Sequence, residues 1–293
     1  MSWNLKIPKI LHLYWGGNKP LSFFRYLTPL SFSKLNPDWE IRVYMPLTPI
    51  QGDKWKQGEQ KASAYNGLDY SANLNKIKNL TVFKMDFYNL GIPKDLPEVH
   101  RSDIVRLYLL KEYGGVWSDF DVLYINPMDN FCYNTDPIRK DSDVFVCYNV
   151  LKGFHSIGFL MGCVEKNYSF FGDVFKKALL LKGSSDYQGY GRFLLESYFK
   201  YLPQEVIKFH ASKGVKVANI PYGTVYAINW EQITRFYFGP KLDFFPDTLG
   251  IHWYAGSPIS STFDNKFNEG TIGEYESIPI YPYIKKALGN SEI

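Results

Sequence analysis

Short apolar runs alternate with helix-like segments through the first half of the chain, and this alternation constrains the fold more than any other feature. Each run ends at a turn signal, as at Gly16-Gly17 and Asn36-Pro37. Strands that alternate with helices predict a mainly parallel sheet with helices on both faces. We therefore expect one α/β domain with helical insertions.

The boundaries follow from the apolar runs and from the Gly and Pro residues that stop them. The expected strands are 7–15, 40–44, 80–83, 116–125, 143–148, 157–163, 216–220 and 249–253. The expected helices are 26–35, 100–113, 169–181 and 190–201, and the polar region 51–79 is either a helical hairpin or a loop.

Composition excludes several kinds of partner and site. The net charge is only +4, from 33 basic and 29 acidic residues, which argues against a nucleic-acid partner. A mild positive charge suits an anionic small ligand or weak attraction to an acidic membrane surface. The three cysteines, Cys132, Cys147 and Cys163, are too few for a disulfide framework and lack metal-site spacing.

The sequence shows no targeting or membrane signal. The first residues contain no apolar run typical of a signal peptide. No segment approaches the roughly 18 consecutive apolar residues of a membrane span. We therefore expect a soluble, cytoplasmic protein, with its oligomeric state open.

Asp119 and Asp121 are the first candidates for chemistry. They stand two apart in the expected strand 116–125, so both carboxylates would point to one face. Two convergent carboxylates favour Mn²⁺ or Mg²⁺, with substrate phosphates and water completing the shell. The preceding helix and Gly114-Gly115 stop strengthen this hypothesis, because ligands of open α/β sheets bind beyond the carboxyl ends of strands.

The helix before this pair carries a second candidate. Residues 104–110 are apolar almost all round, which predicts a buried helix. Asp103 and Arg106 lie three apart and are neighbours on one face of it. Two interpretations remain open: an internal salt bridge, or a ligand site in which the carboxylate binds hydroxyl groups and the guanidinium contacts a diphosphate.

Three ordered stretches resemble a known family. Residues 7–17, 36–40 and 101–122 are similar to the first strand, the second-strand entry and the signature of the glycosyltransferases with a sugar-binding region containing a DXD motif. That group includes family 32 and, more distantly, the glucosylating domains of large clostridial toxins. The similarity covers about the first 150 residues.

The resemblance implies a single GT-A domain over residues 1–293, with a nucleotide-sugar half to about residue 150. The second half would face the acceptor and complete the metal site. The implied reaction moves a sugar, with retention, from a nucleoside diphosphate sugar to a glycan or other acceptor. Uridine diphosphate sugars are the first choice of donor, guanosine diphosphate sugars the second, and Mn²⁺ or Mg²⁺ the cofactor.

The resemblance also implies roles for particular residues. Catalytic roles fall to Asp103, Arg106, Asp119 and Asp121. Donor-binding roles fall to Trp15, His12, Ser102, Asp103, Arg106, Asp119, Gln188 and Ser257. Metal-binding roles fall to Asp119, Asp121 and His252. Asp121 would be a direct ligand, and Asp119 would contact the metal through water or bind ribose and sugar.

Three of these assignments have a structural alternative. Trp15 would stack on the nucleotide base, or it packs in the core at the end of the first strand. His252 would complete the metal site, but Trp253 and Pro258 depart from the family pattern nearby, and a packed strand histidine is the alternative. Gln188 belongs to a stretch, 187–192, that either contacts the donor sugar or is an ordinary loop before a helix.

Two other classes of function remain open. Metal-dependent phosphohydrolases and nucleotidyltransferases also use paired aspartates, although one large group of phosphohydrolases places the pair at the end of the first strand, where this chain has His12 and Trp15. A catalytically inactive carbohydrate-binding protein is the second alternative. The presence of Asp103, Arg106, Asp119 and Asp121 together favours a working enzyme.

Overall fold

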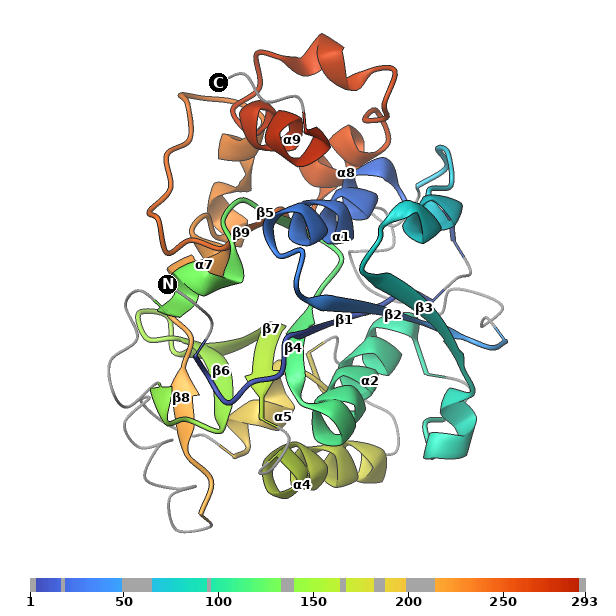
Figure 1. Ribbon diagram of the computed structural model, residues 1–293, viewed down its shortest axis with the longest axis vertical. Coiled ribbons are helices and arrows are strands. Elements are labelled where there is room, and N and C mark those ends of the chain that lie inside the picture. The colour runs from blue at the N-terminus through green and yellow to red at the C-terminus, as the bar shows by residue number, and fades with distance from the viewer. Residues whose placement is uncertain are drawn as a thin grey trace.

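A seven-stranded sheet with helices on both faces forms the centre of the protein (Figure 1). The computed structural model describes residues 4–16, 19–48, 65–93, 96–132, 140–163, 167–181, 188–198 and 214–289. The strand order is β3-β2-β1-β4-β7-β6-β8, and β5 and β9 form a separate two-stranded sheet. The α/β class predicted from the sequence is therefore confirmed.

The described residues form the following elements. The strands are β1 (Ile10–Tyr14), β2 (Glu40–Pro46), β3 (Leu80–Met85), β4 (Gly115–Ser118), β5 (Val122–Tyr124), β6 (Val144–Asn149), β7 (Phe154–Gly162), β8 (Val217–Asn219) and β9 (Gly250–His252). The α-helices are α1 (Phe23–Leu35), α2 (Glu98–Tyr113), α4 (Asn167–Leu180), α5 (Arg192–Glu196), α7 (Gly223–Tyr226), α8 (Pro258–Asp264) and α9 (Tyr281–Leu288). Short 3-10 helices are η2 (Ser71–Lys76), η3 (Phe87–Leu90), η4 (Met128–Cys132), η5 (Trp230–Phe236) and η6 (Ile272–Tyr275).

The sheet is parallel at one side and mixed at the other. Strands β3, β2, β1 and β4 pair in parallel, β7 pairs antiparallel with both β4 and β6, and β8 pairs in parallel with β6. The central strand β1 is buried on both faces, with Leu11 and Leu13 in one hydrophobic cluster and Tyr14 in the other. Burial on both faces explains why these strands appear in the sequence as apolar runs.

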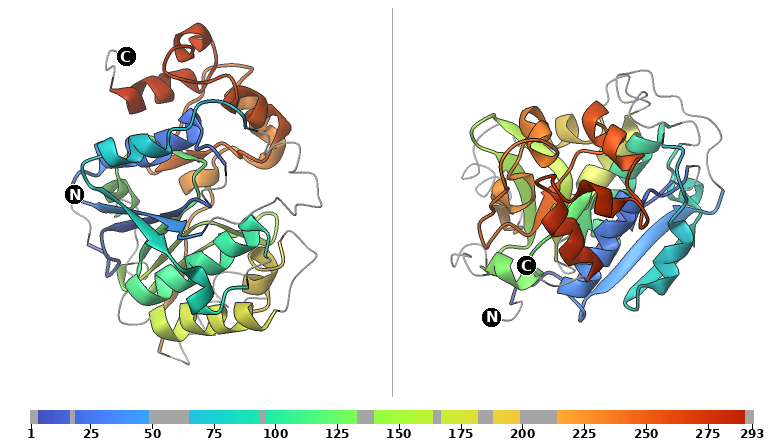
Figure 2. Two further views of the ribbon diagram at one scale, coloured as in Figure 1. Left: turned by 90° about the vertical axis from the view of Figure 1, so that its right-hand side faces the viewer. Right: turned by 90° about the horizontal axis from the view of Figure 1, so that it is seen from above.

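Each face of the sheet has its own layer of helices. Helix α2 packs on α4 and on β1, β4 and β7, and α5 packs on β7. On the other face α1 packs on β5 and α9, and Figures 1 and 2 show the carboxyl-terminal helices beyond α1. The β5–β9 pair therefore belongs to the layer that covers the sheet and not to the sheet itself.

The prediction of a single strand over residues 116–125 is wrong. Strand β4 ends at Ser118, the chain turns at Asp119–Asp121, and β5 pairs with β9 in the second sheet. The Asp119 N–H donates to the Gly158 carbonyl at 2.9 Å, and the Trp253 N–H donates to the Asp121 carbonyl at 2.9 Å. These bonds draw the two ends of the turn toward different partners, so the aspartates lie in a turn and not on a strand.

The other expected elements are found with shifted ends. Of 190–201, only α5 is helical among the described residues, and 199–201 lie outside them, as do 51–64 of the polar region. The rest of that region contains η2. Across the described ranges, no helix combines the length and apolarity that crossing a membrane requires.

The Gly114-Gly115 stop has a steric cause, and His12 supports it. Both glycines have positive φ, 61° and 89°, and a Cβ on Gly115 would lie 2.7 Å from the Ile10 carbonyl oxygen. His12 Nε2 lies 2.8 Å from the Gly114 carbonyl oxygen, and its Nδ1 lies 3.2 Å from the Tyr44 hydroxyl. A neutral ring satisfies both contacts, with Nε2–H as donor and Nδ1 as acceptor.

His12 gives a pH-dependent prediction. Burial lowers the pKa of His12 to about 4, whereas an unfolded histidine titrates near 6.5. The folded state therefore resists protonation of this ring, and stability is lost as pH falls from 6.5 toward 4. His12→Gln keeps a donor and an acceptor but does not titrate. Between pH 7 and pH 5 its unfolding free energy should fall by about 2 kcal/mol less than that of the parent.

Urea denaturation at the two pH values measures this difference. His155, whose pKa burial also lowers to about 4, is present in both proteins, so its contribution cancels. An equal loss of stability in parent and variant would contradict the assignment of a neutral, buried His12.

Candidate metal centre and ligand cleft

A cleft of about 740 Å³ opens at the carboxyl ends of β1 and β4. Tyr14, Trp15 and Gly16 line it at the end of β1, and residues 119–121 line it after β4. The amino-terminal half of α2, His252 and residues 254–256 contribute further parts of the wall. Its location agrees with the ligand sites of open α/β sheets, and its volume is that of a small-molecule site.

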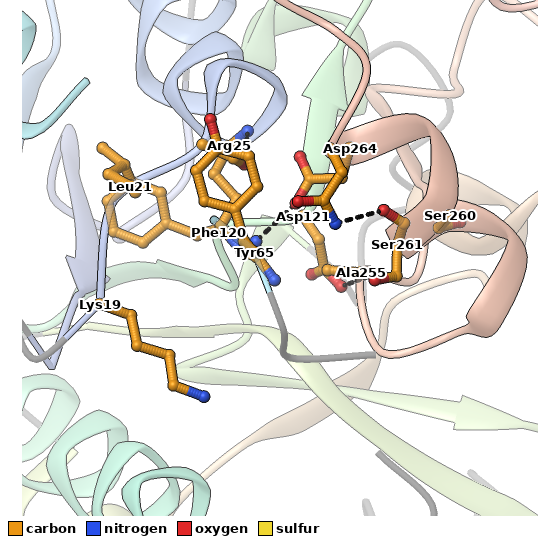
Figure 3. A network of polar contacts seen from close by, with 12 residues as sticks. Lys19, Leu21, Arg25, Tyr65, Phe120, Asp121, Ala255, Ser260, Ser261 and Asp264 are labelled. Carbon is orange, nitrogen blue, oxygen red and sulfur yellow. Dashed lines mark hydrogen bonds and ion pairs between the residues drawn. The ribbon is translucent and has the colours of Figure 1, made fainter. Parts of the chain in front are cut away.

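Asp119, Asp121 and His252 converge in this cleft. One ligand atom from each lies within 4.8 Å of the others. The Asp121 Oδ1 atom is 3.1 Å from His252 Nε2, because β5–β9 pairing places Val122 opposite His252. The second carboxylate oxygen of Asp121 accepts a 2.9 Å hydrogen bond from the Ala255 N–H, and Figure 3 shows these two residues side by side.

This donor set fits a divalent cation. Two carboxylates and one imidazole suit Mn²⁺, and Mg²⁺ accepts the carboxylates with water. The side chains of Asp119 and Asp121 are 29% and 16% exposed, so both remain open to the cleft. A metal held here would have coordination positions left for phosphate oxygens.

Arg106 connects the metal cluster to α2. Its Nη2 atom lies 2.6 Å from Asp103 Oδ1 and 3.5 Å from Asp119 Oδ1, and its Nη1–H donates to the Ile157 carbonyl. Trp117 Nε1–H donates to the same Asp119 oxygen at 2.9 Å. The side chains of Asp103 and Arg106 are 2% and 4% exposed, so the salt bridge expected from the sequence is present and buried. Both residues also line the cleft.

Trp15 combines the two expected environments. It packs against the hydrophobic core, with its ring edge-to-face to Phe120 at 5.8 Å, and it lines the cleft. The Arg25 guanidinium lies 5.5 Å from the centre of the Trp15 ring. The indole N–H donates to the Lys19 carbonyl at 3.2 Å, which fixes the ring plane.

The remaining expected donor-binding residues divide into two groups. Ser102 and Gln188 line the cleft, as expected. Ser257 does not: it is buried as the N-cap of α8, where its hydroxyl accepts from the Ser260 N–H. His12 is also absent from the lining, because it is buried beneath the Gly114 turn. Tyr187, which opens the stretch of Gln188, lies outside the described residues.

Arg25 and Asp264 form a buried ion pair beside the cleft that the sequence did not predict. Arg25 Nη1 donates to Asp264 Oδ2 at 2.7 Å, joining α1 to α8 (Figure 3). Burial raises the pKa of Asp264, and the Arg25 charge opposes that rise. No local signal connects residues 239 positions apart, so only the folded chain reveals the pair.

Comparison with known proteins identifies the region that carries this site. Residues 30–145 match the family model described as "Glycosyltransferase sugar-binding region containing DXD motif". We call residues 30–145 the DXD-type glycosyltransferase region, after the model that they match. A search of curated proteins found no match.

The solved structures to which this chain is similar include several glycosyltransferases. The PaToxG glycosyltransferase is 15% identical, covering 71% of this chain and 78% of its own, with a TM-score of 0.47. The galactosyltransferase LgtC, in complex with donor and acceptor sugar analogues, is 13% identical over 97% of both chains, with a TM-score of 0.43. The glycosyltransferase GlyE of Streptococcus pneumoniae TIGR4 is 8% identical over 96% of this chain and 60% of its own, with a TM-score of 0.45.

The DXD-type glycosyltransferase region contains four of the site residues: Asp103, Arg106, Asp119 and Asp121. It ends more than a hundred residues before His252, so the third member of the metal cluster comes from outside it. The match supports a glycosyltransferase assignment for this region, which contributes the parallel strands β2, β3 and β4 to the α/β sheet.

Substitution of Gly158 tests the metal cluster by displacing Asp119, without replacing any of the three proposed metal ligands. A Cβ at this position would lie 2.6 Å from Asp119 Oδ2 and 2.7 Å from the Tyr226 hydroxyl. Gly158→Ala should displace the Asp119 carboxylate and weaken Mn²⁺ binding about 10- to 100-fold, the usual range for disturbed outer-shell contacts. Gly223→Ala is the matched control, because a Cβ there meets nothing within 4 Å.

Calorimetric titration of the three proteins with Mn²⁺ gives the dissociation constants. The Gly223→Ala constant should equal that of the parent. Equal constants in Gly158→Ala and the parent would show that Asp119 does not contribute to the site.

Proposed function

We propose that this protein is a divalent-metal-dependent glycosyltransferase that uses a nucleoside diphosphate sugar, with uridine diphosphate sugars favoured. Its acceptor is a hydroxyl group of a glycan or another molecule, and the anomeric configuration is retained. The observation that carries the proposal is the convergence of Asp119, Asp121 and His252 in the cleft beside the DXD-type region. The nucleotide, the metal and the stereochemistry come from the family resemblance.

The chain's own residues have distinct tasks in this proposal. Asp121 and His252 hold the cation, with Asp119 as a direct or water-linked ligand. Arg106 keeps Asp103 and Asp119 in place through its two ion pairs. Trp15 provides the face for the nucleotide base, and Asp103 accepts hydrogen bonds from hydroxyl groups of the donor sugar. When bound, the cation stabilises the negative charge that develops on the leaving diphosphate.

The proposed transfer needs no side chain as a nucleophile. The bond between the anomeric carbon and the diphosphate oxygen breaks, and the electron pair leaves with the diphosphate. The acceptor oxygen then forms its bond to the anomeric carbon on the same face of the sugar. The acceptor proton passes to the leaving phosphate oxygen. This sequence of events agrees with a cleft in which Asp103, Asp119 and Asp121 are committed to cation, arginine or sugar. Of the other acidic side chains in the lining, Glu98 accepts from the Tyr14 hydroxyl and Glu231 pairs with Lys152.

A phosphohydrolase or nucleotidyltransferase would use the same aspartates on a different bond. Those reactions break a phosphorus–oxygen bond and release a monophosphate or pyrophosphate. Glycosyl transfer, or slow hydrolysis of the donor, releases the intact nucleoside diphosphate and a sugar. The identity of the nucleotide product therefore separates the two classes.

Substitution of one metal ligand tests the proposed mechanism. Asp121→Asn removes a charge that faces the cation and should lower transfer by about 100-fold or more. The melting temperature should change little, because the amide oxygen can still accept the Ala255 hydrogen bond. Asp243→Asn, an exposed position outside the cleft lining, is the control and should retain full activity. Near-normal transfer by Asp121→Asn would exclude Asp121 as a required metal ligand.

A donor screen tests the proposed function itself. Melting temperatures are measured with a panel of nucleotide sugars at about 100 times the expected dissociation constant, with and without Mn²⁺. Ligand at that excess adds about 2.7 kcal/mol of stability, which corresponds to about 5–10 °C for a chain of this size. The correct donor should produce this shift only when Mn²⁺ is present. Absence of any metal-dependent shift across the panel would contradict the proposal.

A further inference from the structure

A strip of aromatic side chains lines the cleft on the side of His252. It comprises Phe154, Tyr222, Tyr226, Trp230 and Tyr254, and we call it the aromatic strip. None of these residues belongs to the DXD-type region, and none has a role in the metal or donor chemistry described above.

Ring contacts connect the strip to the metal cluster. The His252 ring centroid lies 4.3 Å from that of Tyr254 and 5.0 Å from that of Tyr226. Tyr226 stacks on Tyr222 at 5.0 Å and an interplanar angle of 18°. Trp230 meets Tyr254 edge-on at 5.7 Å. The rings therefore branch from His252 in two directions, through Tyr226 to Tyr222 and through Tyr254 to Trp230.

Exposure differs between the two branches of the strip. Tyr226 is 5% exposed, whereas Trp230 is 47% exposed although it lines the cleft. The backbone holds Trp230 firmly, because the Asn229 side chain caps η5 by accepting from the N–H groups of Glu231 and Gln232. A large, fixed aromatic face that is open inside a cleft is a surface for a ligand to cover.

Charged groups lie beside the outer rings of the strip, Trp230 and Phe154. Lys152 Nζ and Glu231 Oε2 are 2.6 Å apart, and the Arg192 guanidinium lies 4.9 Å from the Phe154 ring centre. All three charged residues line the cleft. An aromatic face beside hydrogen-bonding groups suits a sugar ring, whose axial C–H groups pack on the aromatic face while its hydroxyls reach the charges.

The backbone at Tyr254 is strained in a way that keeps the strip in place. Its φ is 50°, and it is the only non-glycine residue with positive φ among those that the structure describes. This conformation costs about 1–2 kcal/mol and persists where the surrounding structure enforces it, often at ligand sites. It directs the Tyr254 ring between His252 and Trp230.

We propose that the aromatic strip is the acceptor subsite and that the acceptor is a saccharide whose pyranose ring stacks on Trp230. The inference rests on the proposed function for its meaning in catalysis. The donor occupies the part of the cleft near Trp15 and α2, so the strip is the wall left for the second substrate. Its inner end at His252 brings an acceptor hydroxyl next to the metal-bound diphosphate, where the proton is received.

Ligand-observed NMR tests the subsite without any catalysis. Saturation transfer from the protein to a panel of methyl pyranosides reports which ring protons touch it. At least one pyranoside should receive saturation on its C–H face, and Trp230→Ala should weaken its binding about tenfold. Trp230→Phe should recover most of the binding. Phe245→Ala removes an aromatic ring that is 78% exposed but outside the cleft lining, and should bind as the parent does.

A transfer assay separates this inference from the proposed function. With the donor found by the screen and the bound pyranoside as acceptor, Trp230→Ala should raise the acceptor KM about tenfold, with a smaller change in kcat. Hydrolysis of the donor by water should fall much less than transfer. Pyranoside binding that depends on Trp230 in a protein that transfers no sugar supports the subsite and contradicts the function. Unaltered binding in Trp230→Ala, or no pyranoside binding to the parent, overturns the subsite.

Discussion

The pairing of β5 with β9 is the contact on which the whole site depends. It places Val122 opposite His252 and so brings a residue from the last fifth of the chain beside Asp121. The Trp253 and Ala255 N–H groups then bind the Asp121 carbonyl and carboxylate, both at 2.9 Å. The candidate cation site is thus shared between the DXD-type region and the carboxyl-terminal layer, and neither part contains all three of its side chains.

Buried charge sets the second constraint. Asp103 and Asp119 face one guanidinium, that of Arg106, and a buried carboxylate without such a partner would be costly. Arg106 therefore serves stability and function at once, since the contacts that satisfy its charge also fix the two acidic groups that face the cleft. Among the residues that the structure describes, Asp121 forms no ion pair with a lysine or arginine, and its partner is His252. This difference is why the cluster at Asp121 is the natural position for an added positive charge.

Much of the sheet could be predicted from the sequence because strands such as β1, β4 and β6 are buried on both faces and appear as apolar runs. Turn signals such as Gly16-Gly17 and Asn36-Pro37 separate the early elements. The turn at Asp119–Asp121 could not be predicted, because the run from Val116 to Ile125 contains no breaker and the partner of β5 lies about 130 residues away. Local periodicity describes a segment and carries no information about a distant partner. The two aspartates do converge, but through a turn, so the expected result was reached for a different physical reason.

The site residues divide in the same way. The family motifs suggested five residues that line the cleft: Trp15, Ser102, Asp103, Arg106 and Gln188. They also suggested His12, which lies beneath the cleft. The aromatic strip was not predicted, because it takes its rings from four separate segments of the chain, each of which reads as ordinary core or loop. Only the fold shows that these rings gather beside His252.

The most direct test of this account is a crystal structure of the protein with Mn²⁺ and uridine diphosphate, with the metal located by its anomalous scattering. We expect one strong peak within about 2.5 Å of ligand atoms of Asp121 and His252. Asp119 should bind the metal directly or through one water, with the diphosphate on the open side. Two results would contradict a site completed by the β5–β9 pair. One is a peak at another position, and the other is a metal bound by the aspartates while His252 stays paired only to Asp121 and distant from the metal.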